Sequence, residues 1–97
     1  MKRISQAVFD TFTDTGKSLS TWRKIYALKA AQVAERAGIS LGTLSKIENG
    51  DPTVSVAAFL EVLRGLGLLD TFADGLDPLN TDLGRARVNE SLPKRIR

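Results

Sequence analysis

The sequence contains no cysteine and no histidine, and each absence argues against a class of protein. Without cysteine, neither a disulfide framework nor a thiolate metal site can form. Without histidine, the usual general base and the commonest metal ligand are missing. The 11 Asp and Glu side chains that remain are a poor set for a hydrolytic or metal site. We therefore expect no enzyme, no metal and no cofactor.

Long apolar runs are absent as well. No stretch approaches the roughly 18 apolar residues of a membrane span. Polar Ser5, Gln6 and Asp10 interrupt the segment that follows the basic start Met1-Lys2-Arg3, which argues against a signal peptide. The 97 residues, 42% of them hydrophobic, suffice for one core and one domain. We expect a cytoplasmic protein without a membrane contact.

The net charge of +3 is distributed unevenly along the chain. Residues 1–29 hold six basic and two acidic side chains (+4), and residues 30–50 are neutral. Residues 51–83 hold one basic and six acidic side chains (−5), whereas residues 84–97 hold five basic and one acidic (+4). Such segregation predicts one face that approaches a polyanion and another that avoids it.

Apolar residues recur every three or four positions between Leu19 and Leu69, which predicts helices throughout this segment. Gly38 and Gly50 follow helical runs, where a left-handed backbone is common. Ser40 and Ser55 precede such runs and are good helix N-caps. We expect an all-α fold, a compact domain of four or five helices. Its core is predicted to be closed by Leu68, Leu69 and Phe72.

The two ends of the chain have weaker patterns. Ile4, Val8 and Phe12 permit a short N-terminal helix, although neighbouring threonines and Gly16 weaken it. The prolines, glycine and arginines after Leu76 predict an extended tail. The expected organisation is an N-terminal extension over 1–17, a compact helical domain over 18–76, and a basic C-terminal tail over 77–97.

The most informative segment is Ala30–Gly50, which has the spacing of two short helices joined by a tight turn. Ala34 falls where the helices must approach closely, Gly38 opens the turn four residues later, and Ile39 follows as an apolar plug. This register is typical of a helix-turn-helix, whose second helix enters the DNA major groove. The apolar faces are predicted to consist of Val33, Ala37, Leu44 and Ile47.

Leu28 to Gly50 resembles the lambda-repressor/Cro-like (XRE) helix-turn-helix family. The matching segments are Ala34–Ser40, Leu44–Gly50 and Val62–Gly67. The resemblance implies a lambda-repressor-like domain of five helices that binds double-stranded operator DNA as a homodimer. A narrower resemblance, to HipB-like antitoxins paired with HipA-type kinases, rests on Gly50–Ser55, on Leu66–Asp70 and on the basic end Lys94–Arg97.

The resemblance also suggests which residues contact DNA. Family members often carry Gln where this chain has Ala30, so Lys29 or Ser20 is expected to supply that phosphate contact. Leu41 suits a thymine methyl group and Gly42 permits close approach, but neither side chain forms a hydrogen bond to a base edge. Specificity is therefore expected to rest partly on DNA shape. The expected DNA-contacting residues are Lys29, Ser40, Leu41, Gly42, Thr43, Lys46 and Asn49.

Other residues have a structural interpretation. In the resembled fold Arg23 and Glu48 meet and form a bidentate ion pair. Ala34 and Gly38 set the approach of the two helices, and Trp22 is predicted to lie in the core.

The tail has three open interpretations: a disordered end, an arm on the DNA backbone, or a segment that orders on a partner protein. Apolar residues that recur every four positions among the charges favour the partner. Val88 and Ile96 are compatible with short strands. The partner-binding candidates are Arg85, Arg87, Val88, Leu92, Arg95 and Ile96.

These features together favour a dimeric, sequence-specific transcriptional repressor that is also the antitoxin of a HipA/HipB-type module. Two alternatives stay open. One is a stand-alone XRE-type repressor, such as a phage or restriction-system controller, and the other is a helical protein-interaction module without DNA readout.

Overall fold

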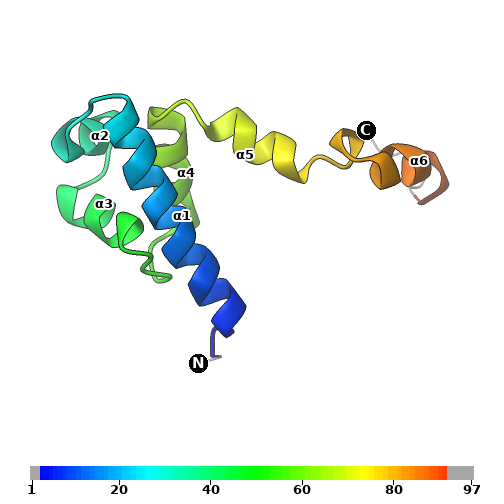
Figure 1. Ribbon diagram of the computed structural model, residues 1–97, viewed down its shortest axis with the longest axis horizontal. Coiled ribbons are helices and arrows are strands. Elements are labelled where there is room, and N and C mark those ends of the chain that lie inside the picture. The colour runs from blue at the N-terminus through cyan, green and yellow to red at the C-terminus, as the bar shows by residue number, and fades with distance from the viewer. Residues whose placement is uncertain (1–2, 92–97) are drawn as a thin grey trace.

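The computed structural model describes residues 3–91. Within this range the fold is all-α, as predicted, and contains no strand. Four helices form the body of the molecule and are followed by two more (Figure 1). The elements are α1 (Gln6–Ile25), α2 (Ala30–Ala37), α3 (Leu41–Glu48), α4 (Val56–Gly65), α5 (Leu69–Leu76), the 3₁₀ turn η1 (Pro78–Asn80) and α6 (Asp82–Ser91).

Serine side chains begin three of these helices. The Oγ atoms of Ser40 and Ser55 accept hydrogen bonds from the backbone N–H groups of Thr43 and Ala58, so both predicted N-caps are confirmed. Ser5 begins α1 in the same way. Between α2 and α3, Gly38 adopts the left-handed conformation with φ of 69°, which confirms its predicted position in the turn.

The core lies between α1, α2, α3 and α4. The four residues predicted for the apolar faces of the two-helix unit are buried, and so is Ala34, which is 4% exposed, whereas the plug Ile39 is partly buried against the core. A larger side chain at Ala34 would have to push its neighbours apart. The buried residues of the core are Leu19, Val33, Ala34, Ala37, Leu44, Ile47, Val62, Leu63 and Leu66.

The N-terminal segment forms more structure than its sequence indicates. α1 is a single helix over Gln6–Ile25, and the domain boundary expected between residues 17 and 18 lies inside it. Gly16 does not weaken this helix in the folded protein, because it is buried where α1 crosses the end of α3. A Cβ atom at Gly16 would lie 2.5 Å from the carbonyl oxygen of Glu48. The glycine is therefore a site of close helix packing.

Two predictions about the core were wrong. Trp22 is 39% exposed and lies against Tyr26, with the ring centroids 5.8 Å apart, because it lies at the edge of the buried side of α1, whose centre is at Leu19. Leu68 packs against the core, but Leu69 and Phe72 are 36% and 42% exposed. The reason is that α5 turns away from the body and has no buried residue.

The segment from α5 to α6, residues 69–91, is called the arm below. Figure 1 shows α5 leaving the bundle of α1–α4 and α6 at the far end of the molecule. The Cα radius of gyration is 16.3 Å, against about 12.5 Å for a compact chain of this length. The tail thus projects as expected, but its described part is mostly helical, and Val88 lies in α6 instead of a strand. Leu92, Arg95 and Ile96 lie outside the described residues.

Over residues 3–91, no helix is both long and apolar enough to cross a lipid bilayer.

Candidate nucleic-acid interface

Helix α3 has a buried side and an exposed side. Leu44 and Ile47 are 1% and 3% exposed and fix the helix on the body, whereas Leu41, the first residue of the helix, is 53% exposed. This orientation leaves a convex face that a DNA groove can receive, and we call it the recognition face. Its exposed residues are Leu41, Gly42, Ser45, Lys46 and Asn49.

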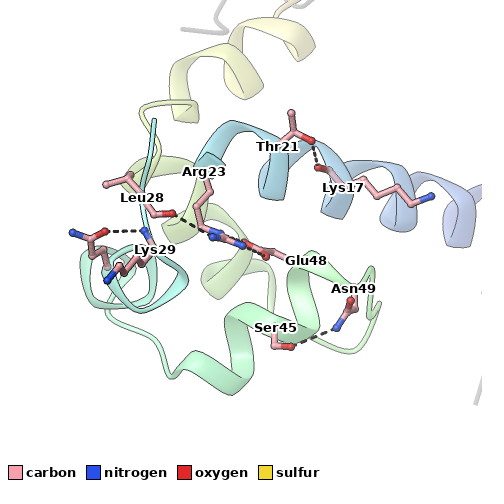
Figure 2. A network of polar contacts seen from close by, with 9 residues as sticks. Lys17, Thr21, Arg23, Leu28, Lys29, Ser45, Glu48 and Asn49 are labelled. Atoms are coloured by element: carbon pink, nitrogen blue, oxygen red, sulfur yellow. Dashed lines mark hydrogen bonds and ion pairs between the residues drawn. The ribbon is translucent and has the colours of Figure 1, made fainter. Parts of the chain in front are cut away.

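Sequence reasoning missed Ser45. It lies one turn from both Leu41 and Asn49, and its Oγ accepts a hydrogen bond of 3.4 Å from the Asn49 side-chain amide (Figure 2). The sequence did contain a signal for Ser45: it follows Leu41 by four residues, and residues four apart lie on the same face of a helix. Ser45 therefore adds a hydroxyl to the polar groups that Lys46 and Asn49 supply on the recognition face.

The side chains of Ser40 and Thr43 are hydrogen-bonded to each other at the start of α3. Their hydroxyl oxygens are 2.9 Å apart, and Ser40 also accepts the backbone N–H of Thr43 at 3.0 Å. Thr43 is partly buried, so it is less available than Ser45 for a contact with a base edge. Both hydroxyls lie at a helix N-terminus, where phosphate oxygens are favoured.

Lys46 has an acidic neighbour in the loop after α3. The Oδ1 atom of Asp51 accepts hydrogen bonds from the Thr53 hydroxyl at 2.6 Å and the Thr53 backbone N–H at 2.8 Å. These bonds hold the pKa of Asp51 below its ordinary value, with a smaller contribution from the positive charge of Lys46. Asp51 is thus ionised at neutral pH and opposes part of the attraction between Lys46 and a phosphate.

The predicted pair of Arg23 and Glu48 is present and joins α1 to α3 (Figure 2). The Arg23 Nε and Nη2 atoms donate to the two Glu48 carboxylate oxygens at 2.8 and 3.0 Å, and Nη1 donates to the Leu28 carbonyl at 3.2 Å. Both side chains are 15% exposed. The hydrogen bonds to Glu48 raise the pKa of Arg23, so its guanidinium stays charged.

Lys29 stands at the start of α2, beside the recognition face. Its backbone N–H donates to the Gln32 side-chain oxygen at 2.7 Å. The Lys29 side chain is exposed, so its ammonium group is accessible to a phosphate. Ala30, in the place of the family's glutamine, is partly buried and packs against the core. A hollow of about 230 Å³ separates this helix start from the recognition face and is lined by Ala30, Leu41, Leu44, Ser45, Glu48 and Asn49.

The described tail candidates, Arg85, Arg87 and Val88, are not part of this surface. Arg85 pairs with Asp82 and donates to the Leu79 carbonyl at 2.9 Å, so its guanidinium serves contacts within the arm. Arg87 is exposed and Val88 is partly buried in α6. Figure 1 places α6 at the far end of the molecule from α3. The structure therefore brings the DNA candidates together and separates them from the three partner candidates that it describes.

The arrangement of α2, the turn at Gly38 and α3 defines a helix-turn-helix protein. In agreement, the family model described as "Helix-turn-helix domain" matches residues 16–74, and the chain belongs to this family. The match supports the predicted XRE-like resemblance and places the chain among DNA-binding regulators. No curated protein and no solved structure matches the chain.

Proposed function

We propose that this protein is a transcriptional repressor that binds operator DNA as a homodimer, with α3 of each copy in a major groove. The observation that carries the proposal is the recognition face, which is exposed on a short helix whose other side is buried. The ion pair of Arg23 and Glu48 supports it by holding α3 on the long helix α1. A rigidly held helix is what base recognition needs.

We assign different roles to the residues of the site. Leu41 contacts a thymine methyl group, Gly42 allows close approach of the helix, and Ser45 and Lys46 reach polar base edges or phosphates. The groups around this face anchor the DNA backbone. These anchors are Lys29, Ser40, Thr43 and Asn49.

We also propose that the protein is the antitoxin of a HipA-type kinase. The narrower sequence resemblance suggests this partner, and the projecting arm supports it because α6 is distant from α3. The arm can then bind the kinase while α3 stays bound to DNA. A stand-alone repressor is the alternative, and a kinase-like gene beside this one separates the two.

Footprinting and gel shifts on the DNA upstream of the protein's own gene test the DNA proposal. We expect protection of an inverted repeat whose half-sites are about 34 Å apart. Lys46→Ala should weaken binding by about 1–3 kcal/mol and, if Lys46 contacts a base, relax the preference at one position.

Arg87→Ala is the matched control, because it removes the same charge from an exposed position on α6. It should bind like the wild type. A shifted complex without any protected inverted repeat contradicts the dimeric proposal, and an unchanged affinity of Lys46→Ala contradicts the role of the recognition face.

A further inference from the structure

The first half of α1, residues 6–15, lies outside the region that the family model matches. That match begins at residue 16, whereas α1 begins at Gln6. The chain therefore adds about three turns of helix to the helix-turn-helix unit. Figure 1 shows this segment, in blue, passing the loop that joins α3 to α4. The added helix thus meets the body close to the end of the recognition helix.

The contact between the two is made by Gly50, which is buried. A Cβ atom at Gly50 would lie 2.7 Å from the Cα atom of Thr13 and 2.9 Å from its backbone nitrogen. Both are backbone atoms of a helix, so no side-chain rotation could make room for the extra atom. Gly50 also has φ of 77°, a conformation that glycine adopts most readily. The close approach to α1 and the left-handed backbone each require glycine here.

Gly50 belongs to the hydrogen-bonded end of α3. Its N–H donates to the carbonyl of Ile47 at 3.1 Å. The N–H of Asp51 donates to the carbonyl of Lys46 at 2.9 Å. This pair of bonds is a Schellman motif, which ties the residues after a helix to its last turn. A displacement of Gly50 therefore moves the backbone of Asn49, which directly precedes it, and disturbs the turn that carries Lys46.

We propose that the first half of α1 is a positioning element of the DNA interface and acts through Gly50. By fixing the loop after α3, it sets the distance of Lys46 and Asn49 from the DNA backbone. The proposal rests on the DNA binding of the proposed function and adds a role for a segment outside the helix-turn-helix unit. Contacts that are held in place before binding lose less freedom when the complex forms. The added helix therefore raises the affinity for operator DNA.

The end of α4 provides a matched control for Gly50. Gly67 has φ of 74°, and the N–H groups of Gly67 and Leu68 donate to carbonyls of α4 at 3.0 and 2.7 Å, in the pattern seen after α3. A Cβ atom at Gly67 meets nothing within 4 Å. Gly50→Ala and Gly67→Ala therefore impose the same backbone strain. Only Gly50→Ala adds a clash with the first half of α1.

Gel shifts of the full-length proteins on the DNA upstream of their own gene measure the effect, at a temperature where circular dichroism shows both variants folded. We expect Gly67→Ala to bind within about twofold of the wild type. Gly50→Ala should bind about tenfold more weakly, which corresponds to the loss of one hydrogen bond to a charged phosphate. A merely structural contact would lower the stability and leave the affinity of the folded protein unchanged. Equal affinities of the two variants therefore overturn the proposal.

Asn49→Ala tests the route by which Gly50 acts. It should weaken binding in the wild type but have little further effect in Gly50→Ala, because the contact of Asn49 is then already lost. An equal effect of Asn49→Ala in both backgrounds contradicts positioning through Gly50.

If Gly50→Ala does not fold, Thr13→Gly takes its place. Glycine loosens the first half of α1 without adding an atom, and Thr21→Gly does the same at an exposed position in the second half. We expect Thr13→Gly to bind about threefold more weakly than Thr21→Gly, and equal binding overturns the proposal.

The wild type in the same gel shifts separates this proposal from the proposed function. A wild type that does not bind its upstream DNA contradicts the repressor and, with it, the positioning role. A wild type that binds this DNA no better than Gly50→Ala contradicts the positioning role and leaves DNA binding intact.

Discussion

Single glycines illustrate how the same residue type has three different roles in this protein. Gly16 lies against backbone atoms of α3, since a Cβ atom there would be 2.5 and 2.6 Å from two carbonyl oxygens. Gly38 has φ of 69° and open space around it, so only its conformation requires glycine. Gly42 lies on the exposed face of α3 with no steric restriction.

These environments predict an order of stability for three alanine substitutions. Gly42→Ala should stabilise the protein by about 0.5–1 kcal/mol, because alanine favours a helix. Gly38→Ala should cost about 1 kcal/mol for a left-handed alanine. Gly16→Ala should cost about 2–3 kcal/mol, because two helix backbones must move apart.

Urea unfolding of the three variants measures this order. The Gly42 variant serves as the control for the substitution itself. Equal stability of the Gly16 and Gly38 variants contradicts the close contact between α1 and α3.

At the scale of the elements, the link between α1 and α3 depends on a planar guanidinium. Arg23 satisfies two carboxylate oxygens of Glu48 and the carbonyl of Leu28, so it connects α1, the following loop and α3. A lysine ammonium cannot reproduce this fork. The pair therefore positions the recognition face as well as stabilising the body.

Arg23→Lys should lower the free energy of unfolding by about 1–3 kcal/mol, because Glu48 is left partly buried with fewer hydrogen bonds. Lys24→Arg, at the neighbouring exposed position, should change it by less than about 0.5 kcal/mol. Thermal unfolding by circular dichroism measures both variants. Arg23→Lys should also weaken operator binding more than Lys24→Arg does, and the reverse order contradicts a positioning role for the pair.

For the whole molecule, the two proposed functions, DNA binding and kinase binding, are assigned to opposite ends of the described chain. Ending the chain after Thr81 removes α6 and the residues that follow, which carry five basic and two acidic side chains, a net charge of +3. We expect the slope of log affinity for operator DNA against log salt to change little. Binding of the truncated chain to a HipA-type kinase should fall.

The salt dependence is decisive because each lost phosphate contact reduces the slope by about 0.9. A slope that drops by three or more units, with kinase binding intact, would show that the tail is a DNA arm. The full-length chain measured in the same buffers is the reference.

The sequence by itself determined the two-helix unit from Ala30 to Gly50. Its signals are local: a Ser40 cap, the left-handed Gly38 and an apolar repeat that matches the helical period. Local backbone chemistry needs no knowledge of distant segments. For the same reason the pairing of Arg23 with Glu48 was predictable only once a family resemblance supplied the helix arrangement.

Only the tertiary structure decided how far the helices extend and what they cover. Gly16 weakens a helix in isolation, but its packing against α3 lets α1 run from Gln6 to Ile25. Trp22 and Phe72 have core-like sequence patterns and are exposed, because burial depends on which other element packs on a given face. Periodicity marks an apolar face without determining which element covers it, and in α5 the described structure leaves Leu76 73% exposed.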